Sequence, residues 1–156
     1  MKDWKKQVLT QAVSRRACQK GIERLTDCNS ISDVMQLYRR EADWALENDV
    51  PSLALLRQLK EARLDLHGLY IDRKFDGETL WDRQVYILRN CKGTIKTGLN
   101  IEQRISPIFY IADGSDITIE SANEDYLTHP ITVPIWLYGD SHITCTTDKL
   151  NCTIHK

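Results

Sequence analysis

The stretch IFYIADGSDITIE, residues 108–120, decides how the second half of the chain folds. It opens with an apolar run, turns at a small polar corner around Asp113, and closes with a segment in which apolar and polar residues alternate. That alternation is typical of a β-strand with one buried face. Similar stretches lie on either side, VYILRNCKGTIKT at residues 85–97 and IWLYGDSHITCTT at residues 135–147. The second half of the chain therefore repeats a unit of strand, corner and strand.

The interval between the copies favours stacked coils. Ile95, Ile117 and Ile143 recur within the range of about 20–50 residues that marks repeat proteins. One coil cannot bury its apolar face alone, whereas stacked coils can. We therefore predict an α+β fold in which residues 68–156 form a short β-solenoid-like body, with NCTIHK as a truncated fourth copy. An antiparallel stack of hairpins with similar turns is the alternative.

The first part of the chain, residues 1–67, has the periodicity of helices. Apolar residues recur at helical spacing from Trp4 onward, Ser30 has the position of an N-cap, and Gly21 and Gly68 are placed as helix stops. Short connections between the predicted helices indicate a unit of three helices. We expect this unit to cap the strand edges at one end of the β-repeat body, so that the two parts form one cooperative unit.

The bulk composition excludes several classes of protein. The 156 residues include 21 Lys and Arg against 22 Asp and Glu, which leaves a net charge of −1 and no overall attraction for nucleic acid. Although the residues up to Cys28 are basic, no helix carries a set of base-reading side chains. No apolar run is long enough to cross a membrane and no secretory signal is present, so we expect a cytoplasmic protein. Five cysteines at irregular spacing predict free thiols.

The sequence Gly139-Asp140-Ser141 matches the motif that contains the nucleophilic serine in a class of esterases. Such a serine needs a strand-to-helix turn and a histidine base within reach. Here a strand-like segment follows, and His142 is adjacent to Ser141, so its side chain points to the other side of the strand. We therefore predict no catalytic residue and a chain that is not an enzyme. A hydrolase is a remote alternative.

A second group of candidates has the ligand types of a zinc site. His142, Cys145, Cys152 and His155 form the pattern H-x2-C-x6-C-x2-H. The spacing is unfavourable, because residues three apart on an extended strand face opposite sides. We predict no metal and no cofactor, while the sequence alone leaves zinc binding by these four residues open.

Aromatic side chains are the candidates for contact with a protein partner. By strand alternation Trp136 faces away from Ile135 and Leu137, which are expected in the core. Together with Tyr110 and Tyr138 it is predicted to form a partner-binding stripe. The alternative is that flanking loops or the helices cover these rings.

Four basic residues near the junction of the two parts are candidates for anion contacts: Arg73, Lys74, Arg83 and Arg89. They would let the chain hold a small molecule or a nucleotide signal between the helices and the first coil. This is the runner-up function.

Five segments carry a resemblance to a known group of proteins: LYRREADWALENDVPSLALLRQLK, GLYIDRKFDGETL, QVYILRNCKGTIKTGLNIE, SPIFYIADGSDITIE and VPIWLYGDSHITC. In these segments the chain resembles small uncharacterised proteins encoded by phages, prophages and mobile elements of gut anaerobes. No activity is assigned to the group, so no residue takes its role from it. The resemblance implies a phage-related setting and a location in the cytoplasm of the host cell.

The predicted function is therefore that of a non-enzymatic interaction protein. It would inhibit or adapt a host protein, or serve as an accessory component of a phage assembly. The partner, or a second copy of the chain, would cover the end of the β-repeat body that the helices leave open.

Overall fold

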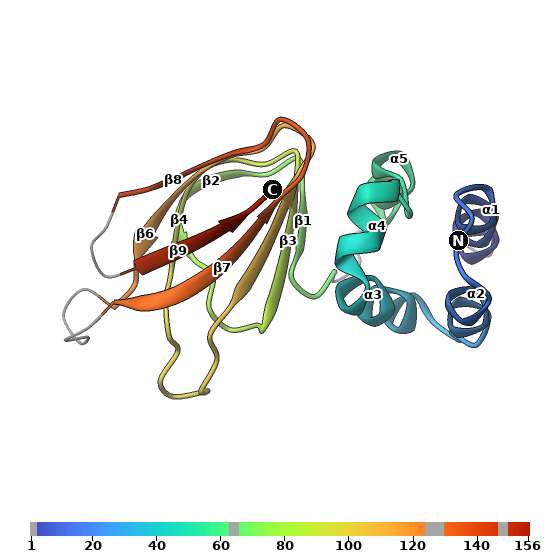
Figure 1. Ribbon diagram of the computed structural model, residues 1–156, viewed down its shortest axis with the longest axis horizontal. Helices are drawn as coiled ribbons and strands as arrows, with labels where there is room; N and C mark the ends of the chain where they lie inside the picture. Colours follow the sequence, from blue (N-terminus) through green and yellow to red (C-terminus); the bar gives the residue numbers. More distant parts are fainter. Residues whose placement is uncertain (1–2, 63–65, 124–129, 147–149) are drawn as a thin grey trace. The chain divides into compact units, whose positions relative to one another are not determined.

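Five helices lead into nine β-strands in the computed structural model, which describes residues 3–62, 66–123, 130–146 and 150–156 (Figure 1). The chain divides into two compact units, Met1–His67 and Gly68–Lys156. The described helices belong to the first unit and the described strands to the second. The fold is α+β, but neither unit has the predicted architecture.

The first unit has five helices where three are predicted: α1 (Trp4–Ser14), α2 (Gln19–Thr26), α3 (Ile31–Arg40), α4 (Ala42–Asn48) and α5 (Leu53–Glu61). The first predicted helix breaks early, because Arg16 takes a left-handed conformation at φ 59° and the Ala17 N–H bonds back to the Ala12 carbonyl. A left-handed residue is a common way for a helix to end. Gly21 therefore lies inside α2 and stops no helix.

The second predicted helix breaks at Glu41, which ends α3 and begins α4 with φ −105° and ψ 29°. Ser30 caps α3 as predicted, since its side chain accepts a hydrogen bond from the Asp33 N–H. The prediction of a three-helix cap is therefore wrong. The structure describes five helices, and they form a compact unit of their own.

The second unit consists of two sheets in which every pair of named strands is parallel. The five-stranded sheet, in the order β1-β3-β5-β7-β9, contains Leu69–Ile71, Val85–Arg89, Ile108–Ala112, Ile131–Leu137 and Leu150–His155. The four-stranded sheet, in the order β2-β4-β6-β8, contains Lys74–Thr79, Lys92–Thr97, Asp116–Ser121 and His142–Cys145.

The two all-parallel sheets overturn both the predicted solenoid-like body and its antiparallel alternative. Strands that are consecutive in sequence lie in different sheets, and the neighbours within a sheet are two strands apart along the chain. A parallel pair needs a crossover connection, and here the intervening strand of the other sheet supplies it. The turns of the repeated unit therefore join two sheets and do not form hairpins.

Left-handed residues make the corners between the sheets. Asp72, Asn90, Asp113 and Gly139 each lie one or two residues after a strand of the five-stranded sheet, with φ of 54°, 52°, 62° and 66°. Aspartate and asparagine tolerate this conformation because their short side chains bond to nearby backbone. Each corner therefore turns the chain toward the other sheet within a few residues.

The register of the four-stranded sheet differs from the predicted alignment at one position. Ile117 is in register with Ile143, but Ile95 pairs with Ile119, and it is Gly93 that pairs with Ile117. The spacing of isoleucines alone therefore misaligned the first copy by two residues.

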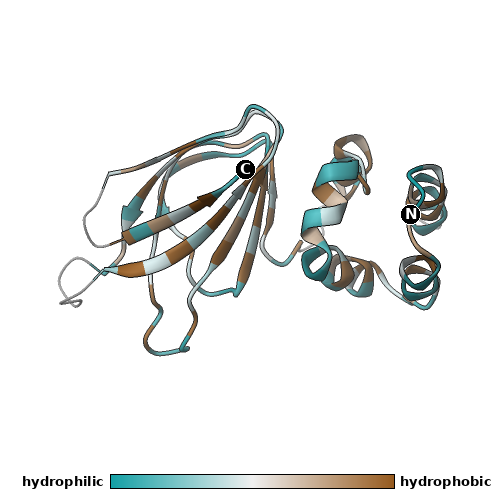
Figure 2. Cartoon of the chain, in the orientation of Figure 1, coloured by the Kyte–Doolittle hydropathy of each residue, from teal (hydrophilic) through white to brown (hydrophobic). Residues whose placement is uncertain are grey.

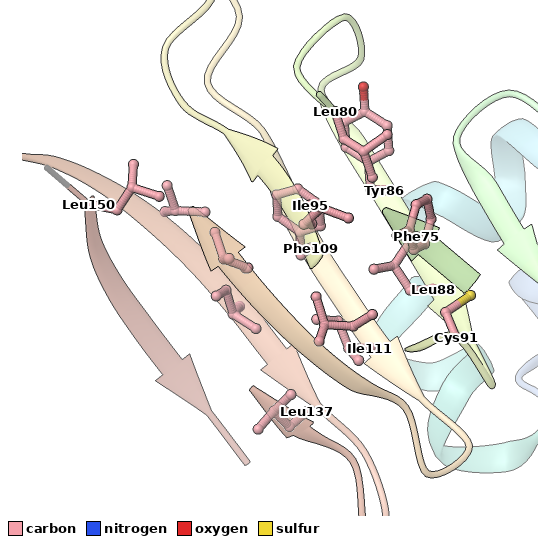
Figure 3. Packing of buried hydrophobic residues seen from close by; sticks show 14 residues of the cluster. Phe75, Leu80, Tyr86, Leu88, Cys91, Ile95, Phe109, Ile111, Leu137 and Leu150 are labelled. Carbon is pink, nitrogen blue, oxygen red and sulfur yellow. The ribbon is translucent and has the colours of Figure 1, made fainter. Parts of the chain in front are cut away.

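The two sheets share one buried core (Figure 3). Tyr86, Phe109 and Ile135 form a row across β3, β5 and β7, and the four-stranded sheet contributes Ile95 and Ile117. These five side chains are fully buried. Apolar and polar residues alternate along several strands (Figure 2), so each of these strands presents one face to the core.

Candidate interaction surface

The face of the five-stranded sheet that points away from the core carries a row of stacked rings. Tyr110 on β5 is in register with Trp136 on β7, and Trp136 is in register with His155 on β9. The Trp136 ring lies 6.3 Å from the Tyr110 ring and 4.0 Å from the His155 ring, with interplanar angles of 13° and 17°. All three residues are half-buried. Stacked rings hold one another in place, so this outer row is a preorganised flat surface.

Two of the three residues predicted to contact a partner, Tyr110 and Trp136, lie side by side in the outer row. Tyr138 follows β7 and is half-buried, and its backbone N–H donates to the Ile111 carbonyl at 3.0 Å. His155 is not among the predicted residues. The truncated copy NCTIHK contains His155, but it is the parallel register of β7 and β9 in the structure that places His155 beside Trp136.

The outer row ends at β9, the last strand of its sheet within the described residues. On the core side, Phe109, Ile135 and Ile154 form a row across β5, β7 and β9. Phe109 and Ile135 are 0% exposed, whereas Ile154 is 45% exposed. The core row therefore ends at Ile154, an apolar side chain that is about half exposed to solvent.

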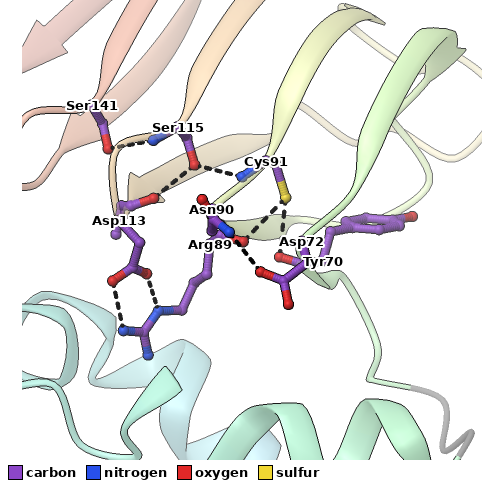
Figure 4. A network of polar contacts seen from close by, with 9 residues as sticks. Tyr70, Asp72, Arg89, Asn90, Cys91, Asp113, Ser115 and Ser141 are labelled. Carbon is purple, nitrogen blue, oxygen red and sulfur yellow. Dashed lines mark hydrogen bonds and ion pairs between the residues drawn. The ribbon is translucent and has the colours of Figure 1, made fainter. Parts of the chain in front are cut away.

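Arg89 and Arg73, both candidate cations, contact other side chains. Arg89 is 2% exposed, and its Nε and Nη2 donate to the Asp113 carboxylate at 2.5 and 3.2 Å (Figure 4). The Arg73 guanidinium lies 5.4 Å from the Tyr70 ring centre and 5.3 Å from that of Phe75. Arg89 is therefore a buried partner of Asp113, and Arg73 packs on aromatic rings.

The remaining two candidate cations, Lys74 on β2 and Arg83 before β3, are exposed. Because Arg89 is buried with its carboxylate partner, it offers little to an anion that approaches from solvent. Of the four residues of the predicted anion site, Arg73, Lys74 and Arg83 are therefore exposed to solvent, whereas Arg89 is not.

The Gly-Asp-Ser segment belongs to a chain of hydrogen bonds between successive corners (Figure 4). Ser141 Oγ accepts from the Ser115 N–H at 3.2 Å, and Ser115 Oγ accepts from the Cys91 N–H at 2.9 Å. The His142 side chain is 70% exposed, and its Nδ1 lies 4.0 Å from Asp116 Oδ1. Among the described residues, no hydrogen bond joins Ser141 to a histidine. The Ser141 hydroxyl thus links two corners, and the absence of a catalytic serine stays a prediction.

The four candidate zinc ligands separate into a pair and two single residues. The Sγ atoms of Cys145 and Cys152 are 2.7 Å apart, and both side chains pack against the core. His142 lies on the exposed face of β8, whereas His155 stacks in the outer row of the other sheet. Within the described ranges, no group of three or more His, Cys, Asp and Glu side chains is arranged to hold a metal ion.

Comparison of the chain with protein-family models, with curated proteins and with solved structures finds no match in any of the three. A membrane span is not found either: none of the helices that the structure describes is long and apolar enough to cross a bilayer.

Proposed function

We propose that this chain is a non-enzymatic protein-interaction module that takes up an extended strand of a partner protein along β9. The observation that carries the proposal is the exposure of Ile154 at the end of a core row whose other members, Phe109 and Ile135, are fully buried. Complete burial of an isoleucine side chain stabilises by about 1.5–3 kcal/mol. A partner that covers Ile154 gains part of this free energy.

The backbone of β9 supports addition of a strand. Along one side of an edge strand, the N–H and C=O groups form no hydrogen bonds with a neighbouring strand. Many peptide-binding proteins bind an extended peptide at such an edge. The side chains would set the specificity. A partner residue paired with Ile154 would be apolar, and one paired with His155 would be a flat ring that continues the outer row.

The biological setting of the proposal rests on the resemblance to phage-encoded proteins. The partner is then a host or phage protein in the cytoplasm of the host cell, which the module inhibits, adapts or helps to assemble. With a net charge of −1, the chain would rely on shape and apolar contact and not on long-range attraction.

The substitution Ile154→Lys tests this proposal, with Ile101→Lys as its matched control. Ile101 is 59% exposed in the connection between β4 and β5, so both variants place the same charge on an exposed isoleucine. We expect wild type and Ile101→Lys to capture the same protein from host lysate and Ile154→Lys to lose it. Hydrogen exchange of the captured complex should show new protection of the β9 amides.

Two results would contradict the proposal. One is a partner that Ile154→Lys retains with unchanged affinity, or whose binding leaves the β9 amides unprotected. The other is self-association: light scattering of the purified chain would show a dimer that Ile154→Lys converts to a monomer. That outcome would assign the β9 edge to a second copy of the chain.

A further inference from the structure

The helical unit contains a cavity of about 360 Å³ between α1 and α2 on one side and α3 and α4 on the other. Its lining is mostly apolar and includes Val8, Ala12, Leu25, Val34, Trp44 and Val50. Pockets that bind small molecules typically have volumes of about 300–1,000 Å³ and an apolar lining with a few polar groups. The cavity therefore has the size and the character of a small-molecule site.

Part of the lining is basic. Arg16, Lys20 and Arg24 line the cavity together with one acidic residue, Glu41. Arg24 Nη1 donates to Glu41 Oε1 at 3.1 Å, so these two charges offset each other. Arg16 and Lys20 are exposed, and neither forms an ion pair with a residue that the structure describes. They leave the cavity with an excess of positive charge.

We propose that the helical unit binds an amphipathic anion, namely a long acyl chain that ends in a carboxylate. The acyl chain would lie among the apolar side chains, and the carboxylate would contact Arg16 and Lys20. A guanidinium binds a carboxylate through two parallel hydrogen bonds, and an ammonium adds a point charge. A cationic amphiphile of the same length would bury the same apolar surface but meet like charge. This site lies wholly inside the helical unit and is independent of the β9 edge.

Gly21 offers a way to fill the cavity without disturbing the fold. It lies inside α2 and lines the cavity, and a Cβ built on it has one neighbour within 4 Å beyond its own helix and chain neighbours, Cys18 Sγ at 3.5 Å. Leucine also favours a helix more strongly than glycine does. We therefore expect Gly21→Leu to occupy the cavity while α2 stays intact.

Calorimetric titration of the full chain with dodecanoate and with dodecyltrimethylammonium tests the proposal. The two amphiphiles carry alkyl chains of about the same length (eleven and twelve carbons) and opposite charges, and both are used below the concentration at which they form micelles. We expect saturable binding of dodecanoate, about tenfold or more tighter than that of the cation. Circular dichroism checks that each variant keeps the helical content of the wild type.

Two double variants with matched loss of charge test the role of the basic lining. Arg16→Gly with Lys20→Gln removes both cations, and glycine suits the left-handed φ of 59° at position 16. Arg15→Gln with Lys6→Gln removes two exposed cations of the same unit that do not line the cavity. We expect the first pair to weaken dodecanoate binding about tenfold, the second to leave it unchanged, and Gly21→Leu to abolish it.

The proposal is overturned if dodecanoate does not saturate, or if it binds no better than dodecyltrimethylammonium. It is also overturned if dodecanoate binds Gly21→Leu as it binds wild type, since the ligand then lies elsewhere. If Gly21→Leu loses its helical content, the two charge-matched double variants provide the test. Equal dodecanoate affinity of these two variants then overturns the proposal.

Discussion

Arg89 is a charged side chain that the fold buries almost completely, with 2% exposed. Its guanidinium is held by Asp113, which lies 24 residues later in the chain. Removing two charges from water is costly, and their attraction and hydrogen bonds offset that cost only while both partners are present. In the sequence Arg89 was a candidate for ligand binding, because nothing near it in the chain reveals this partner.

The substitution Asp113→Asn should lower the free energy of unfolding by about 1.5–3 kcal/mol, because the buried Arg89 guanidinium then loses hydrogen bonds to a charged acceptor. Asparagine keeps the left-handed corner conformation, so the backbone is not the cause. Asp116→Asn is the control, since the Asp116 side chain is 70% exposed and we expect a change within about 0.5 kcal/mol. Urea unfolding measures both variants. Equal, small losses would show that the pair contributes little.

Cys145 and Cys152 form another close pair, in which the Cys152 thiol donates to Cys145 Sγ. Burial, followed by the hydrogen bond with Cys145, raises the pKa of the Cys152 thiol to about 12. At neutral pH this thiol is therefore protonated, and a protonated thiol is a poor nucleophile.

We expect oxidised glutathione to join Cys145 and Cys152 in a disulfide, slowly at neutral pH and faster as the pH rises, because the thiolate is the attacking form. Each crosslink consumes one oxidised glutathione and releases two reduced ones. Mass spectrometry of peptides should find this crosslink, while the exposed Cys18 forms a mixed disulfide with glutathione. A rate that does not increase with pH, or a Cys152 that reacts as fast as Cys18, would contradict the expectation.

At the scale of elements, the parallel pairing of β2 with β4 depends on a glycine. Gly93 on β4 is in register with Phe75 on β2 and has φ 116°. A Cβ at this position would lie 2.0 Å from the Phe75 carbonyl oxygen, far inside van der Waals contact. The two strands can therefore approach each other only because Gly93 has no side chain.

The substitution Gly93→Ala should destabilise the protein more than Gly77→Ala does. Gly77 on β2 has φ 86° and no neighbour within 4 Å of a built Cβ, so alanine there adds only backbone strain, about 1–2 kcal/mol. Gly93→Ala adds a clash to the same strain, and we expect a further loss of about 1–3 kcal/mol. Urea unfolding of the two variants gives the difference. If the two variants lose the same free energy of unfolding, β2 and β4 accommodate the added methyl group at no cost, which would contradict this expectation.

Some helix ends could be predicted from the sequence, and others could not. Ser30 caps α3 through a bond to the Asp33 N–H three residues on, a local interaction that the sequence displays. The breaks at Arg16 and Glu41 carry no glycine or proline, and both residue types are common inside helices. The sequence pattern therefore merged α3 with α4 into one predicted helix and missed most of α2, which lies beyond the stop predicted at Gly21.

For the whole molecule, each candidate site belongs to one of the two units. The β9 edge and the outer row lie in residues 68–156, and the cavity lies in residues 1–67. Variants of one site therefore leave the residues of the other unchanged, and the two proposals can fail separately.

The sequence by itself determined the local features of this protein. Strand alternation put Ile135 in the core and Trp136 on the outer face, and aspartate and asparagine marked the left-handed corners. These features depend on residues a few positions apart, whose conformational preferences the sequence carries directly.

Tertiary structure alone decided which strands pair and which side chains meet. The parallel sheets join strands that are not consecutive, His155 stacks on Trp136, and Arg89 finds Asp113. The cavity between α1, α2, α3 and α4 likewise exists only once those helices have packed. Such contacts depend on the register of segments far apart in the chain, and a slip of one residue in a strand would turn each of its side chains to the opposite face.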